Sequence, residues 1–161
     1  MAPNIYSQCR YPEGIQGEWK INKSQSQEIL PEIEELVTEV NFILRSIVRS
    51  KLFLTNPAYK YIEFEDSHSD FWKLSLDREK WILISKKNQT LLWEDDENKT
   101  VSIIPVDLEN ETQGLEILTS TGTKSLIFSC LRHNRMKLDI EVQSKKLPRT
   151  LKYFLIYNLI N

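Results

Sequence analysis

The sequence has few cysteines and histidines and no excess of charge of either sign. Cys9 and Cys130 are too few for a disulfide framework, and together with the two histidines they show no metal-ligand spacing. The net charge is −2, and lysines and arginines are scattered among acids rather than gathered in a basic stripe. The sequence therefore predicts neither a metal site nor a nucleic-acid partner.

Long apolar runs are also missing. No segment approaches the ~20 apolar residues that a membrane-spanning helix requires, so no membrane span is predicted. The first ten residues, MAPNIYSQCR, contain no apolar core of the kind found in signal peptides. A cytoplasmic location is the resulting expectation.

Catalytic signatures are absent too. The sequence has no glycine-rich phosphate loop and no Ser-His-Asp or Cys-His order that indicates an activated nucleophile. No cofactor and no catalytic residue are predicted. Catalysis by positioning a reactive ligand can leave no motif, so an enzyme is not excluded.

A single amphipathic helix is predicted from about residue 27 to 50. Its aliphatic residues recur at spacings of three and four, which places them on one helical face. Acids crowd the first half of this stretch and basic residues the second, which complements the helix dipole. Because this face is too apolar for water, we expect all of it to pack onto the rest of the domain. The nine residues of the face are Ile29, Ile33, Leu36, Val37, Val40, Ile43, Leu44, Ile47 and Val48.

Strands are predicted on both sides of this helix. A first strand covers 17–23, and from Tyr59 onward the hydrophobic period changes to two. Turn-type sequence separates nine further segments, although the chain has only four glycines, few for so many tight turns. The nine segments are 59–65, 70–77, 80–86, 89–94, 99–108, 113–119, 123–131, 135–142 and 150–159.

The fold class that follows is mainly β: an antiparallel β-barrel of about ten strands, with one long amphipathic α-helix between strands one and two. Sheets with this many strands commonly close on themselves, because closure removes unpaired edges. Residues 1–14 are predicted to form a loosely ordered arm and residues 15–161 a single barrel domain.

The opening Gly17-Glu18-Trp19-Lys20-Ile21 and the order strand, helix, nine strands resemble the calycin superfamily. That superfamily includes lipocalins, fatty-acid-binding proteins and lipocalin-like lyases, and the element order is most similar to the last two. The resemblance implies a barrel with an apolar interior, in which Trp19 plugs the closed end. One departure is the helix, since fatty-acid-binding proteins have two short helices there.

Five residues are candidates for contact with a ligand. Trp72 and Trp81 lie in successive strands and suit a flat or apolar ligand if they face inward, but plain packing is the commoner use of such residues. Tyr153 and Tyr157 share one face of the last strand, and a buried hydroxyl there needs a hydrogen-bond partner. Arg149 precedes them as a candidate anchor for an anionic group, and its order with the two tyrosines resembles the Arg and Tyr of the fatty-acid-binding branch.

Three function classes remain open. The first is binding of a small hydrophobic ligand (fatty acid, isoprenoid or pigment) in the barrel, which needs only an apolar interior and a few polar contacts. The second is a lipocalin-like enzyme, a lyase, isomerase or cyclase that uses the same cavity, as in phycobiliprotein chromophore lyases. The third is a non-catalytic interaction module. Both faces of the last strand are apolar, so that strand is a candidate surface for a homodimer or a protein partner.

Overall fold

The computed structural model describes residues 16–66, 70–79, 81–94, 99–107, 112–131 and 134–160. The arm predicted over residues 1–14 lies outside these ranges. Three helical segments lie between the first two strands: α1 (Ile29–Thr38), a short 3-10 helix η2 (Phe42–Leu44) and α2 (Arg45–Thr55). The strands are β1 (Gly17–Ile21), β2 (Tyr61–Asp66), β3 (Phe71–Leu76), β4 (Trp81–Ser85), β5 (Leu91–Glu94), β6 (Thr100–Asp107), β7 (Thr112–Leu118), β8 (Thr123–Leu131), β9 (Arg135–Gln143) and β10 (Leu151–Leu159).

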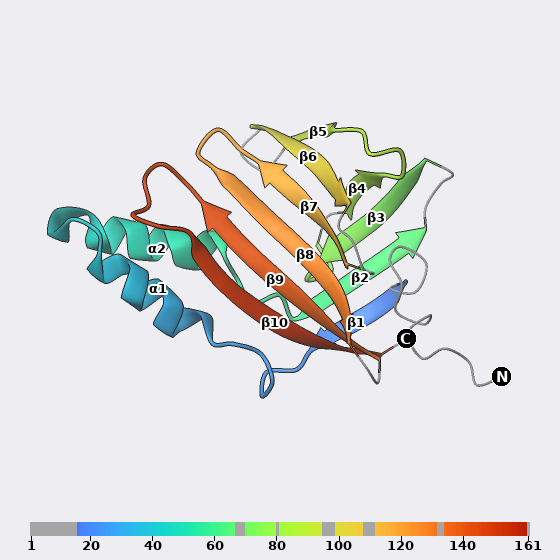
Figure 1. Ribbon diagram of the computed structural model, residues 1–161, viewed down its shortest axis with the longest axis horizontal. Helices are drawn as coiled ribbons and strands as arrows, with labels where there is room; N and C mark the ends of the chain where they lie inside the picture. The colour runs from blue at the N-terminus through green and yellow to red at the C-terminus, as the bar shows by residue number, and fades with distance from the viewer. Residues whose placement is uncertain are drawn as a thin grey trace.

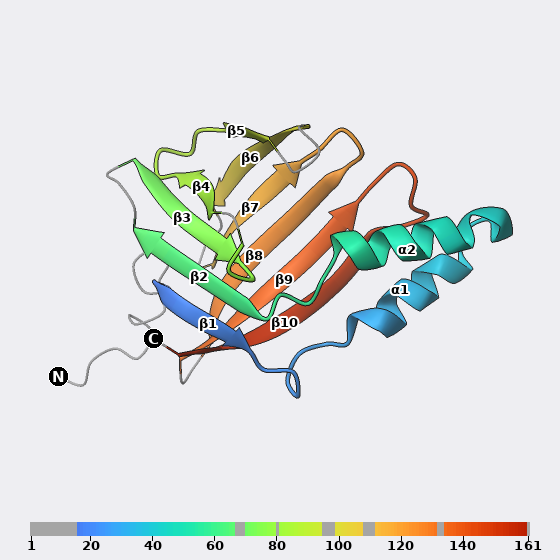
Figure 2. The ribbon, with the colours of Figure 1, turned by 180° about the vertical axis from the view of Figure 1, so that it is seen from behind.

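The ten strands form one antiparallel sheet that curls into a nearly closed barrel (Figure 1). β1 pairs with both β2 and β10, so the first and last strands of the chain are neighbours (Figure 2). β4 and β5 are the two ends of the strand order, and β4 contacts β5 and β6 across the seam. The predicted ten-stranded antiparallel barrel is confirmed.

The turns explain how a chain with four glycines forms so many hairpins. Left-handed backbone conformations, which turns often require, are taken by polar residues instead: φ is 54° at Asp77, 56° at Asn88 and 55° at Asn134. Asn and Asp tolerate this region better than other residues with a side chain. The Asp77 carboxylate also accepts hydrogen bonds from the backbone N–H groups of Lys60 and Tyr61, which joins the β3–β4 turn to the start of β2.

The prediction of one long helix is wrong, because the helical segment breaks at Asn41. The Asn41 side chain accepts a hydrogen bond from the Ile43 backbone N–H and so caps a new helical turn. Arg45 donates to the carbonyl oxygens of Thr38 and Val40, which the end of α1 leaves unpaired. Two helices therefore form a hairpin, and this hairpin extends beyond the end of the barrel (Figure 1).

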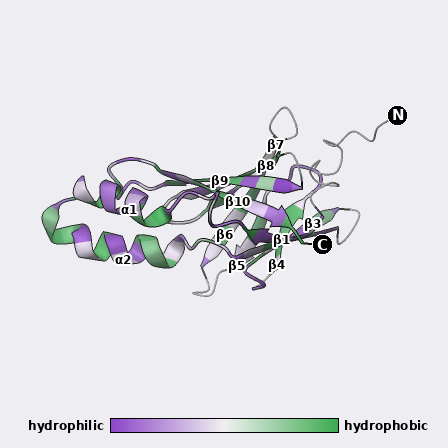
Figure 3. Cartoon of the chain, turned by 90° about the horizontal axis from the view of Figure 1, so that it is seen from below, coloured by the Kyte–Doolittle hydropathy of each residue, from purple (hydrophilic) through white to green (hydrophobic). Residues whose placement is uncertain are grey.

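Only the first part of the predicted apolar face packs as expected. Ile33, Leu36 and Val37 are at most 1% exposed, and α1 contacts β10. In the second part, Ile43 is 80% exposed and Ile47 66%, because the hairpin carries them past the barrel (Figure 3). The expectation that the whole face is buried is therefore wrong for the tip of the hairpin.

The core fills the barrel and continues under α1. Trp19 is fully buried on β1, in line with its expected place in the core. Alternate residues of each strand point inward: Leu126 and Phe128 on β8 pack with Leu138 and Ile140 of β9 in one hydrophobic cluster.

Two further observations concern the surroundings of the protein. No helix in the described part of the chain is long and apolar enough to cross a membrane. Cys130 on β8 is disulfide-bonded. Disulfides are typical of oxidising compartments, so the cytoplasmic location stays a prediction.

Candidate functional site

Polar groups gather inside the barrel at the end where the helices attach. We call Tyr59, Lys124, Tyr153 and Tyr157 the mouth cluster. Tyr59 follows α2, Lys124 lies near the start of β8, and both tyrosines of β10 point inward and are at most 3% exposed. Tyr153 and Tyr157 are thus two of the five predicted site residues, and the structure brings them together.

Strand pairing explains why Lys124 belongs to this cluster. Lys124 lies two residues before Leu126 and therefore shares the inward face of β8. Leu126 pairs with Ile140, and Ile140 pairs with Tyr153, so the tyrosine lies one inward position deeper than the lysine. Reasoning from the sequence missed Lys124, although a lysine on the apolar face of an alternating strand is a visible signal.

The Lys124 ammonium is held by neutral oxygen atoms. Its Nζ donates to the Tyr59 hydroxyl oxygen at 2.6 Å and to the Thr55 carbonyl oxygen at the end of α2 at 3.1 Å. Its Nζ also lies 5.0 Å from the centre of the Tyr59 ring. No carboxylate in the described ranges pairs with it. An anionic group of a ligand would therefore find a cation without an acidic partner.

Burial controls the titration of the cluster. It lowers the pKa of the Lys124 ammonium to about 8, because the apolar surroundings disfavour the charged form. The same burial raises the pKa of the Tyr59 hydroxyl, and the nearby charges of Asp77 and Glu79 add to the effect. Burial likewise raises the pKa of Tyr153 and Tyr157, so all three tyrosines are neutral donors at physiological pH.

The two tyrosines of β10 differ in their hydrogen bonds. The Tyr157 hydroxyl donates to the Tyr59 carbonyl oxygen at 2.7 Å. The Tyr153 hydroxyl is buried and has no partner among the described residues. A buried polar group without a partner costs free energy, and one way to satisfy it is a ligand oxygen.

This difference gives a matched pair of variants. Tyr157→Phe should lower the free energy of unfolding by about 1–2 kcal/mol, because the Tyr59 carbonyl is left unpaired in the core. Tyr153→Phe removes a hydroxyl with no protein partner, so stability should be unchanged or slightly higher. Urea unfolding of both variants measures this, and equal losses would contradict the assignment of the two hydroxyls.

The other three predicted residues are placed differently. Trp72 on β3 is 6% exposed and belongs to the core. Trp81 on β4 is 36% exposed and stands on the outer face, where the Lys73 Nζ lies 5.9 Å from its ring centre. Arg149 is also outside: its Nε donates to Glu39 at 2.5 Å, which ties the end of α1 to the start of β10.

Comparison with solved structures shows which known proteins have a similar fold. The barrel is similar to a fatty-acid-binding protein of Echinococcus granulosus, with 15% identity, a TM-score of 0.56, and coverage of 91% of this chain and 97% of that one. A Schistosoma mansoni fatty-acid-binding protein in complex with arachidonic acid has 12% identity and a TM-score of 0.54, and the match covers 98% of this chain and 100% of that one. Lipid binding protein 8 of Caenorhabditis elegans, solved in its apo form, has 9% sequence identity to this chain and a TM-score of 0.55. The match covers 89% of this chain and 94% of that one. The protein shares the barrel fold of these three proteins. At these identities the likeness shows the fold alone.

Sequence comparison adds nothing further. No protein-family model matches the chain, and no curated protein is similar to it in sequence. The departure noted from the sequence, one long helix, is absent from the structure, which has two short helices, α1 and α2, between β1 and β2.

The interior of the barrel is packed by its own side chains. Inward-facing residues of the strands form a continuous cluster, in which Phe64 and Phe128 meet edge to face at 5.0 Å. A ligand chain can enter this cluster only if these side chains move apart.

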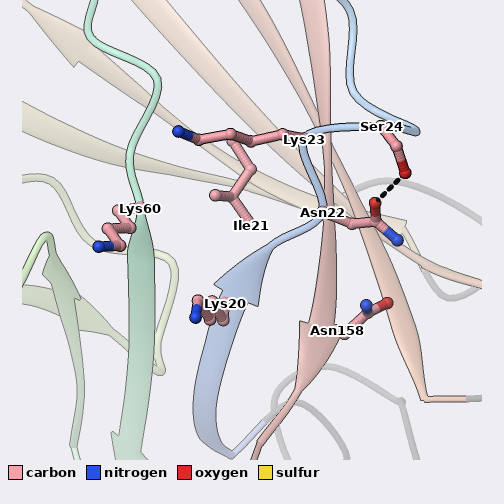
Figure 4. Close-up of a pocket in the computed structure, with 7 residues that line it drawn as sticks. All are labelled: Lys20, Ile21, Asn22, Lys23, Ser24, Lys60 and Asn158. Carbon is pink, nitrogen blue, oxygen red and sulfur yellow. Dashed lines mark hydrogen bonds between the residues drawn. The ribbon is translucent and has the colours of Figure 1, made fainter.

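One open hollow lies outside the barrel, next to the end of β1. It has a volume of about 520 Å³, and three lysine side chains lie around it, Lys20, Lys23 and Lys60, with Asn158 on the β10 side (Figure 4). Its polar groups are on the surface of the protein, so it does not resemble an enclosed ligand site. The described part of the chain holds no group of three His, Cys, Asp or Glu side chains that could hold a metal ion.

Proposed function

We propose that this protein binds a small hydrophobic molecule whose oxygen-bearing end lies at the mouth cluster. The observation that carries the proposal is Lys124, a cation on the otherwise apolar inward face of β8, whose Nζ donates to two neutral oxygens. The unpartnered Tyr153 hydroxyl supplies a donor one position deeper. Together they suit a carboxylate or a carbonyl, while the apolar part of the ligand lies among the inner side chains.

The fold supports the same proposal. The similar solved structures include proteins whose names state that they bind fatty acids, and one of these contains arachidonic acid. Tyr157 and Trp72 are buried in the same continuous core as the cluster and would line the apolar part of the site. The proposal assigns no ligand contact to Trp81 or Arg149, since both lie on the outside.

A fluorescent fatty acid tests the proposal. Wild-type protein should bind the probe, and Lys124→Met should weaken binding by about 10- to 100-fold, because a charge-assisted hydrogen bond is lost. Tyr153→Phe should weaken it by about 3- to 10-fold without lowering stability. Binding should also weaken as the pH rises above about 8, where the Lys124 ammonium loses its proton.

Two controls make this experiment specific. Lys152→Met removes an exposed lysine of β10 that pairs with Glu141, and it should not change binding. A methyl ester of the same fatty acid keeps a carbonyl oxygen but has no negative charge, so Lys124→Met should weaken its binding much less than that of the acid. Undiminished binding of the acid by Lys124→Met would place the polar end elsewhere, and no binding by the folded wild type would refute the proposal.

The interaction module is the second candidate, and two observations favour it. The barrel interior is already packed, and the hairpin tip presents apolar side chains to solvent, with Phe42 80% and Leu54 83% exposed. Failure to bind the probe, together with self-association in sedimentation experiments, would favour this function. A homodimer through the last strand and a lipocalin-like enzyme both stay predictions.

A further inference from the structure

Lys124 is set apart from other lysines of the protein by what surrounds its amine. Lys86, Lys137 and Lys152 each pair with a carboxylate on the barrel surface. Lys124 instead lies on the inward side of β8 at the barrel mouth, with its Nζ between the Tyr59 hydroxyl and the Thr55 carbonyl. An amine in apolar surroundings, beside a hydroxyl and free of acidic partners, is the arrangement that carbonyl-binding lysines use.

We propose that Lys124 binds apolar aldehydes covalently, as an imine formed at its Nζ. This rests on the proposed function, because the apolar part of the aldehyde would occupy the same interior as the hydrophobic ligand. The inference narrows the ligand class, since a carboxylate could form only a salt bridge with Lys124, whereas an aldehyde could form a bond.

The reaction needs a neutral amine, and the surroundings of Lys124 supply it. With its pKa lowered to about 8, roughly a tenth of Lys124 is unprotonated at pH 7, against fewer than about one in a thousand for an ordinary lysine. Tyr59 is the titratable group that faces the amine directly, and its raised pKa keeps it neutral, so it does not hold the proton on Lys124 by charge.

The step balances without any further reactant. The Nζ lone pair attacks the aldehyde carbon, and the carbonyl π electrons move onto the oxygen. A proton then passes from nitrogen to this oxygen, which gives a carbinolamine. The carbinolamine then loses water as the nitrogen lone pair forms the C=N bond. The Tyr59 hydroxyl lies 2.6 Å from Nζ, where it can protonate the departing hydroxide and take the proton that nitrogen releases. The products are one imine and one water.

Reductive trapping of the full chain tests this inference. The protein is mixed with dodecanal, treated with sodium cyanoborohydride, and examined by intact mass and peptide mapping. We expect one dodecyl group per chain, located at Lys124 and at least tenfold more abundant there than at Lys152. Lys124→Arg keeps the positive charge but cannot form an imine, so it should lose this adduct. Mapping of the wild type is decisive even if that variant folds poorly.

The fluorescent fatty acid separates failure of the inference from failure of the proposed function. Fatty-acid binding without a Lys124 adduct would overturn the imine and leave the proposed function standing. Labelling spread evenly over the surface lysines, as the polar aldehyde glyceraldehyde should produce, would also overturn it. A Lys124 adduct whose formation the fatty acid suppresses would support both, since the two ligands would compete for one site.

Discussion

Val40→Asp is expected to lower the free energy of unfolding by about 2–4 kcal/mol, because it places a carboxylate in the core without a partner. Val40 is 8% exposed and belongs to the hydrophobic cluster under α1. Ile47→Asp puts the same charge on the same predicted apolar face, yet Ile47 is 66% exposed. That variant should stay within about 0.5 kcal/mol of the wild type.

Chemical denaturation of the two variants side by side measures the difference. Circular dichroism first establishes that each is folded at low denaturant. A Val40→Asp protein as stable as Ile47→Asp would show that α1 is not anchored on the barrel. Equal and large losses in both variants would instead mean that the hairpin tip is buried, by a second copy or by the barrel itself.

Lys124→Met is expected to abolish a rise in the free energy of unfolding that the wild type shows between pH 7 and 9.5, because the surroundings of Lys124 disfavour its charged form in the folded state. The pKa of this lysine is lowered from 10.5 to about 8. Between these two values the unfolded chain binds more protons than the folded one, so wild-type stability should rise with pH across this window. The gain in stability is complete above 10.5, the pKa of Lys124 in the unfolded chain, and it is lost as the pH falls through about 8, its pKa in the folded protein.

Urea unfolding of wild type and Lys124→Met at pH 7, 8 and 9.5 checks whether stability rises with pH and whether Lys124 causes the rise. The upper limit stays below the ordinary tyrosine pKa of 10.0, above which the buried tyrosines contribute the opposite slope. Lys152→Met should keep the wild-type slope, since its amine is exposed. A wild-type stability that falls from pH 7 to 9.5 would refute the lowered pKa of Lys124.

Strands such as β9 could be predicted from the sequence because they have a two-residue period and a polar turn on either side. In β9, inward Met136, Leu138 and Ile140 alternate with charged residues, and the structure buries those three completely. A sheet of many such segments gains by closing, so the barrel followed from local pattern plus the removal of edges.

The helical hairpin required tertiary information. Its apolar face runs without interruption from Ile29 to Val48, so periodicity alone favours one helix. The break depends on Asn41 as a cap and on Arg45 reaching back to Thr38 and Val40, and neither contact is encoded in the hydrophobic period. An asparagine in mid-helix was the available signal.

The candidate site, too, could be predicted only in part from the sequence. That Tyr153 and Tyr157 share a face was set by their spacing in the sequence, whereas the face of Trp81 depended on register. β4 reads Trp81-Ile82-Leu83-Ile84, apolar at every position, and only its pairing with β3 turns Ile82 and Ile84 inward and Trp81 outward. Lys124 meets Tyr59 across 65 positions of sequence, so their hydrogen bond exists only because the barrel brings β8 to the end of α2. The alternation of side chains is a local property of the chain, but which residues share a site is decided by strand pairing.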